Sequence, residues 1–276
     1  MIAAIVVAYN ATSTPDALWR VLAGRCRLII VDNSTKTHCR QQLRDWANTL
    51  AVDLVDMRGN AGIAAAQNAG IARAREIGAS VVMFFDQDSL VDEHAIDSLA
   101  AAITSGGTSV HCLLPGAYST DHVASLPIRD LMSSGSGCPL SVFEIVGEFE
   151  ADLFIDCVDF EWGWRCRSHG IPLVGLRVGT FRHTLGKSSI RALGMVAHID
   201  SPVRGYYQFR NVTAMMLRRY VPPAWKAAQC VRSAGKLLLL VIHSDDRPTR
   251  LRMVARGIRD GLSGHLGPCV VRAPRS

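Results

Sequence analysis

Four short runs of apolar residues in the first third of the chain alternate with segments in which apolar residues recur at helical spacing. The apolar runs, which we interpret as strands, cover residues 2–8, 27–31, 52–57 and 81–85. The helical segments lie at about 14–23, 39–50 and 62–76. Strands that are apolar throughout are typical of a parallel sheet with helices on both faces. The pattern therefore predicts an α/β fold built on a mostly parallel sheet.

The middle of the chain is less regular, and its end is helical. After residue 101, clusters of Gly and Ser interrupt the pattern until a helix over Val158–His169 and a short strand over Val178–His183. Further helices are predicted at roughly 205–220, 224–242 and 247–262. We therefore predict an α/β domain over residues 1–201 and a helical region over residues 202–276.

The distribution of charged residues changes at the same boundary, between residues 201 and 202. The net charge of +6 combines an acidic first part with a C-terminal region, residues 202–276, that holds 14 Lys and Arg but only three Asp. Such a region suits nucleic acid or an anionic membrane surface. It lacks the interleaved aromatic residues that stack on bases, which argues against nucleic acid.

The eight cysteines and the apolar stretches bear on the cellular compartment. No Cys-x-x-Cys pair is present, which argues against a zinc site and for reduced thiols in a cytoplasmic protein. The N-terminus reads as a first strand and lacks the basic start of a signal peptide. The longest apolar stretch, Leu237–Ile242, is far shorter than the ~20 residues that span a bilayer. We expect a soluble or peripheral protein.

Two carboxylates, Asp86 and Asp88, leave the fourth predicted strand where its apolar run stops. Aspartate is rarely buried unless it is paired or bound to metal. Mg²⁺ is usually held by one or two carboxylates together with substrate phosphates. The pair predicts a metal-nucleotide site at the carboxyl end of a strand, where open α/β sheets bind ligands. The alternative is an acidic turn that caps a helix starting near Asp92.

Polar residues also follow the earlier strands and should line the same crevice. Asp32 follows the second strand and can accept the N3–H of a pyrimidine base, while Tyr9 offers a ring for stacking. An ordinary turn and cap sequence would look the same. The segment from Asn60 to Gly70, which includes Gly62 and Asn68, reads as a small-residue loop that enters a helix, and such a loop suits a diphosphate. Its alternative is an Ala-rich helix that packs on the sheet.

A third cluster of acids lies near the middle of the chain. Asp156, Asp159 and Glu161 fall within six residues, beside Phe and Trp. A carboxylate in apolar surroundings can have a raised pKa and act as a general base. The residues alone do not choose between Asp156 and Asp159. His183, at the end of a predicted strand, is either a metal ligand or a structural histidine.

Taken in order, these segments resemble the family 2 glycosyltransferases of GT-A fold. The resemblance lies in Val-Ala-Tyr-Asn, Val-Asp-Asn-Ser, Asn-x-Gly, Asp-x-Asp, the acidic helix and His-x-x-Gly-x-Ser. Within that family, bacterial rhamnosyltransferases of polysaccharide assembly are similar in Phe-Phe-Asp-Gln-Asp-Ser, Ser134-Gly135, residues 154–162 and Tyr206-Tyr207 followed by Arg210-Asn211.

The resemblance implies a role for each candidate residue. Tyr9 and Asp32 would hold the base, and Asp159 would be the catalytic base, with Asp156 and Glu161 as alternatives. Asp86 and Asp88 would hold the donor and a divalent cation, Mg²⁺ or Mn²⁺, with Asp88 as the direct ligand, and His183 would complete the metal sphere. Residues 1–105 would bind the nucleotide sugar, and residues 106–201 would bind the acceptor and carry the catalytic base.

The implied reaction is inverting transfer of a deoxysugar, L-rhamnose from dTDP-L-rhamnose, to a lipid-linked saccharide at the inner face of a bacterial membrane. One alternative is another dTDP- or UDP-sugar as donor. A sugar-nucleotide nucleotidyltransferase would carry a Gly-rich basic loop after the first strand, where this chain has Asn10-Ala11-Thr12. A non-enzymatic nucleic-acid-binding protein would explain only the basic C-terminal region.

Overall fold

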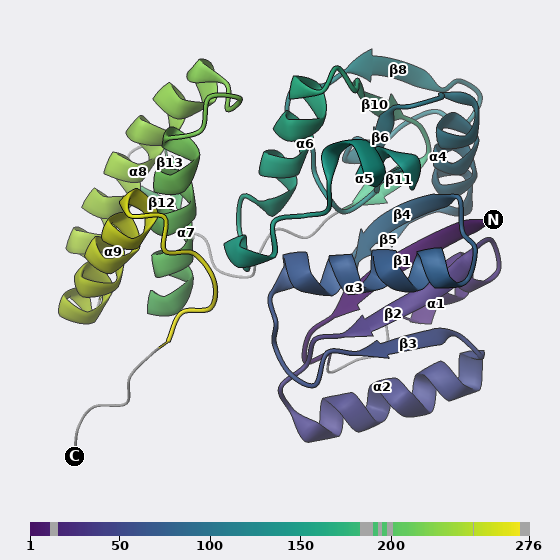
Figure 1. Cartoon of the computed structure of the whole chain (residues 1–276), viewed down its shortest axis with the longest axis horizontal. Helices are drawn as coiled ribbons and strands as arrows, with labels where there is room; N and C mark the ends of the chain where they lie inside the picture. Colours follow the sequence, from purple (N-terminus) through teal and green to yellow (C-terminus); the bar gives the residue numbers. More distant parts are fainter. Residues whose placement is uncertain (12–15, 183–189, 193–194, 198–200, 245, 271–276) are drawn as a thin grey trace. The chain divides into compact units, whose positions relative to one another are not determined.

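The computed structural model describes residues 1–276 except 12–15, 183–189, 193–194, 198–200, 245 and 271–276 (Figure 1). The chain divides into two compact units. The first unit comprises Met1–Ala151 and Trp162–Thr184, and the second comprises Asp152–Glu161 and Leu185–Ser276.

The first unit is built on an eight-stranded sheet with the order β3-β2-β1-β4-β9-β6-β10-β8. The four N-terminal strands, β3, β2, β1 and β4, run parallel to one another. Strand β9 lies antiparallel between β4 and β6, and β10 runs parallel to β6 and antiparallel to β8. The strands are β1 Ile2–Ala8, β2 Arg27–Asp32, β3 Asp53–Asp56, β4 Val81–Asp86, β6 Val110–Leu113, β8 Ala124–Pro127, β9 Ser136–Pro139 and β10 Leu173–Arg177. The predicted α/β architecture with a mostly parallel sheet is confirmed.

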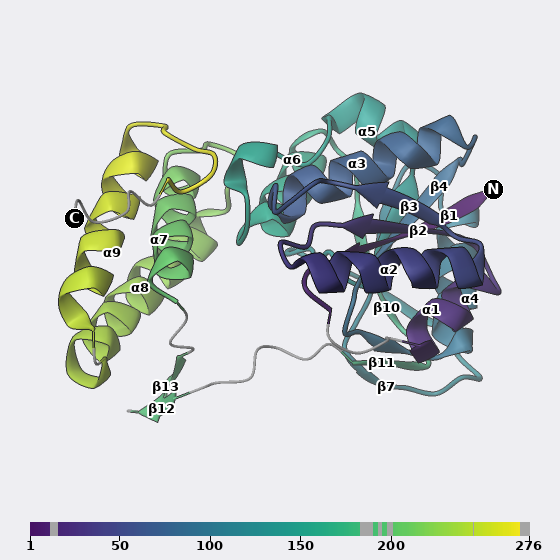
Figure 2. The same ribbon diagram turned by 90° about the horizontal axis from the view of Figure 1, so that it is seen from below.

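Helices cover both faces of this sheet. Helices α3 and α5 lie on one face, and α1 and α4 lie on the other (Figure 2). Close packing of α3 depends on Gly70, because a Cβ there would stand 2.5 Å from Cγ2 of Ile5 on β1. The helices are α1 Asp16–Ala23, α2 Thr37–Leu50, α3 Ile63–Glu76, α4 Glu93–Ser105, α5 Ser141–Val146 and α6 Val158–Ser168.

The remaining described strands form two small sheets. Strands β5 Leu90–Val91, β11 Thr180–Arg182 and β7 Gly116–Ala117 form the first, and β12 Ile190–Ala192 pairs with β13 Met195–Ala197 in the second. Asp92 caps α4 by accepting a hydrogen bond of 2.8 Å from the N–H of Ala95. The predicted strand over 178–183 corresponds to β11, and His183 lies outside the described residues.

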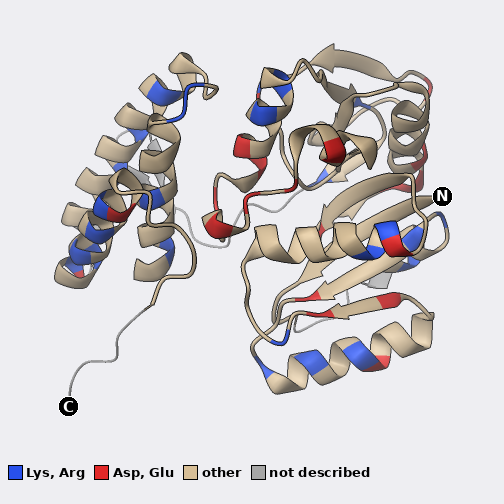
Figure 3. Cartoon of the chain, in the orientation of Figure 1, with Lys and Arg blue, Asp and Glu red and all other residues tan. Residues whose placement is uncertain are grey.

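The second unit consists mainly of three helices, α7 Pro202–Met216, α8 Pro223–His243 and α9 Arg247–Leu262. Two glycines let α9 approach α7, since a Cβ at Gly257 or Gly261 would lie 2.5 Å from the carbonyl oxygen of Tyr206 or Arg210, respectively. Many Lys and Arg residues lie on these helices (Figure 3). Within the described parts of the chain, no helix combines the length and apolar character needed to cross a bilayer.

Candidate active site

The ends of β1 and β4 are joined through one side chain. The amide of Gln87 accepts a hydrogen bond of 2.8 Å from the N–H of Tyr9 and donates one of 3.4 Å to the Tyr9 carbonyl. Tyr9 therefore stands beside the Asp86-Gln87-Asp88 turn, with 45% of its surface exposed. The structure brings these predicted site residues to one edge of the sheet.

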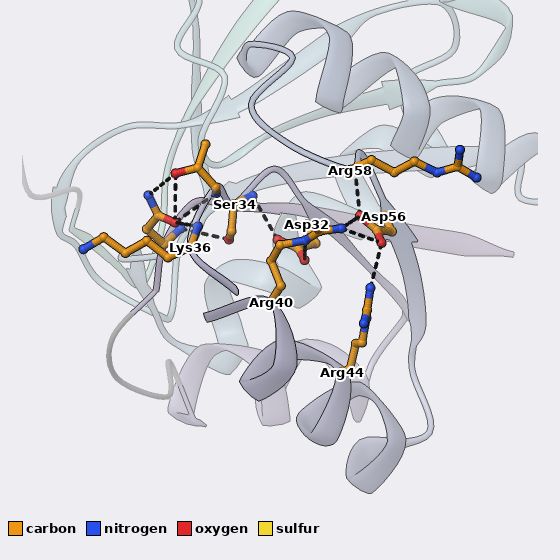
Figure 4. A network of polar contacts seen from close by, with 9 residues as sticks. Asp32, Ser34, Lys36, Arg40, Arg44, Asp56 and Arg58 are labelled. Atoms are coloured by element: carbon orange, nitrogen blue, oxygen red, sulfur yellow. Dashed lines mark hydrogen bonds and ion pairs between the residues drawn. The ribbon is translucent and has the colours of Figure 1, made fainter. Parts of the chain in front are cut away.

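Asn10, which the sequence patterns did not single out, connects the loops after β1 and β2. Its backbone has a φ of 47°, a left-handed conformation that Asn adopts more readily than most residues. The Asn10 carboxamide oxygen accepts hydrogen bonds from the N–H groups of Thr35 at 3.1 Å and Lys36 at 2.9 Å. The N–H of Asn10 donates to Ser34 at 2.9 Å (Figure 4). The loop that follows Asp32 is thereby fixed.

Asp32 is buried at the end of β2 with one oxygen satisfied and one not. Its Oδ1 accepts a 2.9 Å hydrogen bond from the N–H of Ser34. Its Oδ2 makes no hydrogen bond with any described residue, and the nearest cationic group is Nε of Arg40 at 3.7 Å. Leaving a buried polar atom without a hydrogen bond is unfavourable. Asp32 thus retains the capacity to accept a hydrogen bond from a ligand.

Arg40 reaches past Asp32 to Asp56 at the end of β3. Its guanidinium donates to both carboxylate oxygens of Asp56, at 2.8 and 2.9 Å, and Arg44 adds a third bond at 3.0 Å (Figure 4). Burial by itself raises the pKa of Asp56, but the Arg58 N–H and the two guanidiniums outweigh it and hold that pKa below its ordinary value. The sequence patterns did not predict a role for Arg40 or Asp56, because their pairing depends on the alignment of β2 with β3.

The loop that enters α3 is tied to the residue after Asp32. Asn33 donates to the side chain of Asn60 at 3.2 Å and accepts from the N–H of Ala61 at 2.8 Å. Asn60 in turn accepts from the N–H of Gly62 at 3.0 Å. Gly62 has a φ of 89°, which favours glycine, and it precedes the first residue of α3. Asn60 and Gly62 therefore lie beside Asp32, as the predicted crevice requires.

Asn68 and Gln67 lie further along α3, where their amides contact other loops. The Asn68 side chain donates to the Phe149 carbonyl at 2.8 Å and accepts from the Phe149 N–H at 3.1 Å. Gln67 donates to the hydroxyl of Ser133. Asn68 thus fixes the main chain beyond α5, and its predicted contact with the nucleotide sugar stays a prediction.

The Asp-Gln-Asp turn is held by two serines. The hydroxyl of Ser134 accepts from the N–H of Asp86 at 3.0 Å and lies 2.6 Å from the hydroxyl of Ser89. Asp86 is half-buried, whereas Asp88 is exposed and forms no hydrogen bond or ion pair within the described chain. Ser134 was quoted in the family resemblance, but no sequence signal gave its role. These hydrogen bonds hold the turn in place, and Asp88 is exposed to solvent.

Two carboxylates suffice for a Mg²⁺ or Mn²⁺ ion when substrate phosphates supply further oxygens. The chemistry of Asp86 and Asp88 fits this requirement. Among the described residues, no three His, Cys, Asp or Glu side chains gather into a complete cation site. The predicted third ligand, His183, lies outside those residues.

Asp156 lies on a loop with an unusual backbone, residues 153–157, which we call the acidic loop, whereas Asp159 and Glu161 lie on α6. Phe154, Asp156 and Cys157 each have a φ of 65°, although none is glycine. A left-handed conformation is unfavourable by about 1–2 kcal/mol per residue, so the loop needs support. It leads into the first turn of α6, which carries Asp159.

The support comes from the Arg210-Asn211 pair of α7. The fully buried Arg210 donates to the carbonyl of Asp152 at 3.0 Å, to that of Leu153 at 2.8 Å and to that of Gly267. The side-chain nitrogen of Asn211 lies within hydrogen-bond distance of three loop carbonyl oxygens, at 2.9, 2.7 and 2.8 Å, those of Leu153, Ile155 and Asp156. We call this set of contacts the carbonyl clamp.

The three candidate acids have different surroundings. Asp156 pairs with Arg204 at 3.2 Å. Glu161 is buried, accepts a 2.6 Å hydrogen bond from the hydroxyl of Tyr220 and lies 3.4 Å from Arg218. Burial, followed by the hydrogen bond to Glu161, raises the pKa of Tyr220 to about 12. Asp159 is half-buried on the first turn of α6.

Comparison with known proteins extends these observations. Residues 3–131 match the model of the Glycosyl transferase family 2. The dTDP-rhamnosyl transferase RfbF of Shigella flexneri is 29% identical over 287 residues, which cover 96% of this chain and 96% of RfbF.

Solved structures are similar in fold. S. aureus TarS 1-349 in complex with UDP-GlcNAc aligns with a TM-score of 0.59 and 16% identity, over 94% of this chain and 80% of that one. The chain spans about half, 48%, of the longer TarS chain, which aligns with a TM-score of 0.58. GalNAc-T7 with UDP, GalNAc and Mn²⁺ aligns with a TM-score of 0.54 and 15% identity, over 70% of this chain and 44% of that one. The fold predicted from the sequence is confirmed.

Proposed function

Because the chain is a family 2 glycosyltransferase resembling rhamnosyltransferases, we propose that it transfers L-rhamnose from dTDP-L-rhamnose to a lipid-linked saccharide. The step belongs to the synthesis of a bacterial surface polysaccharide. The similarity to a dTDP-rhamnosyl transferase along nearly the whole of both chains supports this donor. Another dTDP- or UDP-sugar is the alternative donor.

The observation that most directly supports the proposal is the buried carboxylate of Asp32, which would recognise the nucleotide base. Its Oδ2 has no hydrogen-bond donor among the described residues, although Oδ1 is satisfied by Ser34. The N3–H of thymine or uracil supplies the missing donor. The exposed ring of Tyr9 offers a stacking surface for the base. This pair selects a thymidine or uridine nucleotide and does not by itself choose the sugar.

Asp86 and Asp88 hold the leaving group through a divalent cation. Their oxygens are ligands that Mg²⁺ and Mn²⁺ accept, and Ser134 and Gln87 keep the turn in place. When bound, the cation neutralises charge that develops on the diphosphate. The diphosphate also lies toward the loop of Asn60 and Gly62, where backbone N–H groups at the start of α3 favour an anion.

Asp159 removes the proton from the acceptor hydroxyl. The hydroxyl oxygen then attacks C1 of the sugar on the face opposite the diphosphate, so the configuration inverts in one displacement without a covalent enzyme intermediate. Asp159 is preferred because it falls where the acidic helix of the resembling family carries its catalytic Asp, on the first turn of α6. Asp156, which pairs with Arg204, and Glu161, which lies buried between Tyr220 and Arg218, are the alternatives.

The C-terminal helices attach the enzyme to an anionic membrane surface, where a lipid-linked acceptor resides. On α9, Leu251, Ile258 and Leu262 are 38%, 37% and 60% exposed. Their spacing of i, i+7 and i+11 places them on one helix face. Exposed Arg252 and Arg259 border this face. An apolar stripe beside arginines suits a helix that lies in the headgroup region of anionic lipid.

The reaction and the attachment need separate tests. Purified protein should release dTDP from dTDP-L-rhamnose in the presence of acceptor and Mg²⁺ or Mn²⁺, whereas Asp88→Ala and Asp159→Asn should lower turnover at least ~100-fold. Near-normal turnover in either variant would remove its assigned role. For attachment, flotation with phosphatidylglycerol vesicles should fail for the Leu251→Gln, Ile258→Gln, Leu262→Gln variant. No flotation of the unmodified protein would reject attachment.

A further inference from the structure

Two buried polar atoms near the end of β2 make no hydrogen bond with any described residue. One is Oδ2 of Asp32, an acceptor, and the other is Nε of Arg40, a donor. They lie 3.7 Å apart, which is close enough for their charges to attract but longer than a hydrogen bond. A buried donor or acceptor without a hydrogen bond lowers stability. A ligand that satisfies both atoms at once is therefore bound favourably here.

The far end of the Arg40 guanidinium is held by Asp56. Its Nη2 donates to both carboxylate oxygens of Asp56, at 2.8 and 2.9 Å (Figure 4). Asp32 and Asp56 are paired positions on the neighbouring strands β2 and β3, so the two carboxylates belong to the same end of the sheet. A planar guanidinium can bind one carboxylate through a terminal nitrogen while its Nε–H stays available beside another, and an ammonium cannot. Arg40 is therefore fixed with its Nε–H beside Asp32.

The two atoms offer a ligand an acceptor next to a donor. An ionised carboxylate only accepts hydrogen bonds, and a guanidinium only donates them. Among the pyrimidines, thymine and uracil carry the complementary pair, an N3–H with a carbonyl oxygen beside it. Cytosine has a bare acceptor nitrogen at N3, which would face the Asp32 carboxylate with no proton between them. The pattern therefore matches thymine and uracil and opposes cytosine.

We propose that Arg40 is a specificity-determining residue for the base. Its Nε–H donates to the carbonyl oxygen next to N3, either O2 or O4, while Asp32 accepts the N3–H. This role rests on the proposed function, since it takes the donor to be a thymidine or uridine diphosphate sugar. It assigns a residue of α2 to the nucleotide, in addition to the residues at the strand ends. Two hydrogen bonds in the plane of the base then fix its orientation.

The test is a calorimetric titration of the full chain, with Mn²⁺ present, using dTDP, UDP and the 2-thio and 4-thio analogues of dTDP. Sulfur is a weaker acceptor than oxygen, so one of the two analogues should bind the unmodified protein about 3- to 10-fold more weakly than dTDP. That analogue identifies the carbonyl that Arg40 contacts. Arg40→Lys should raise the Kd for dTDP about 10-fold and bind the same analogue as tightly as dTDP, because the Nε–H donor is lost.

Arg44→Lys is the matched control. Arg44 lies four residues further along α2 and also donates to Asp56, at 3.0 Å, but its ion pair is with Asp56 rather than with Asp32. The chemical change and the carboxylate affected are the same as in Arg40→Lys. Arg44→Lys should keep both the affinity for dTDP and the weaker binding of the analogue.

Each outcome decides the role of Arg40. Loss of discrimination in Arg40→Lys, with discrimination kept in Arg44→Lys, supports it. Equal binding of dTDP and both analogues by the unmodified protein overturns it, whether or not the variants fold, and so does discrimination that persists in Arg40→Lys. Arg40 then forms a structural ion pair only, and the proposed thymidine or uridine donor still stands. If neither dTDP nor UDP binds the unmodified protein, the proposed donor is wrong and the role of Arg40 falls with it.

Discussion

The buried guanidinium of Arg210 donates a 2.8 Å hydrogen bond to the carbonyl of Leu153, across 57 positions of the sequence. The contact belongs to the carbonyl clamp, which holds a loop with three non-glycine residues in left-handed conformations. The rings of Tyr206 and Tyr207 lie 5.5 and 4.9 Å from the same guanidinium. A cation held by carbonyls and aromatic faces gives the acidic loop one defined shape.

Arg210→Lys should release this loop. An ammonium cannot reproduce the fork of a guanidinium, so at least one of the carbonyl bonds is lost. We expect unfolding to require about 2–3 kcal/mol less free energy in a urea titration. Turnover should fall more than ~10-fold, with the KM for the nucleotide sugar unchanged, because the donor residues lie in the first unit.

Arg256→Lys is the control for that change. Arg256 lies over the same Tyr206 ring, at 5.3 Å, but its bonds go to Asp260 and to the Val270 carbonyl rather than to the acidic loop. Hydrogen exchange at residues 154–157 should quicken in Arg210→Lys and stay unchanged in Arg256→Lys. Equal protection in the two variants would show that the clamp does not hold the loop.

Ser134→Ala should loosen the Asp86-Gln87-Asp88 turn. The change removes the acceptor for the Asp86 N–H and the partner of the Ser89 hydroxyl. Each of these two groups is then left without a hydrogen bond, which costs about 1–3 kcal/mol of stability per group. Titration of activity with Mn²⁺ should then need roughly 10-fold more metal. Ser98→Ala, on the exposed side of α4, should leave the titration unchanged. A Ser134→Ala titration that overlays the unmodified one would contradict a role for Ser134 in positioning.

The sequence predicted the parallel part of the sheet well and its antiparallel part poorly. Strands such as Ile2–Ala8 are buried on both faces, so every position is apolar and the strand can be recognised as a continuous apolar run. Strand β9, Ser136–Pro139, carries no such run, because its position between β4 and β6 depends on pairing with distant partners. A Cβ at Gly137 would meet the Val82 carbonyl at 2.7 Å, so close approach selects glycine there.

The candidate site divides in the same way. Asp32, Asp86 and Asp88 were recognisable because each follows an apolar strand. Ser134 acts on Asp86, 48 positions away, and Arg40 pairs with Asp56, 16 positions away. A helical arginine or a loop serine carries no pattern that reveals its partner. Functional residues at the ends of strands can therefore be predicted from the sequence. The residues that hold them in place can be identified only once the three-dimensional arrangement of the strands is known.

Asp32→Asn should weaken binding of the nucleotide while preserving the fold. The carboxamide that replaces the carboxylate keeps one oxygen for the Ser34 N–H, but its NH₂ group faces the N3–H of the base with a donor instead of an acceptor. We expect the Kd for dTDP to rise about 10- to 100-fold, measured by calorimetry, because a hydrogen bond to a charged group is lost. The Asp45→Asn control, on the exposed part of α2, should bind dTDP normally. Unchanged affinity in Asp32→Asn would exclude Asp32 from base recognition.

Asp56 should make stability depend on pH in the acid range. Burial raises the pKa of Asp56. The Arg58 N–H and the guanidiniums of Arg44 and Arg40 lower this pKa by more than burial raises it, so the folded-state pKa lies below the unfolded-state pKa. The carboxylate then contributes stability above about pH 4, and this contribution is lost as pH falls through the folded-state pKa. In urea titrations between about pH 5 and 2.5, the free energy of unfolding should fall more steeply for the unmodified protein than for Asp56→Asn. Asp121→Asn, in an exposed loop, should follow the unmodified curve. If Asp56→Asn also follows that curve, the Arg40–Asp56 pair does not stabilise the β2–β3 edge against acid.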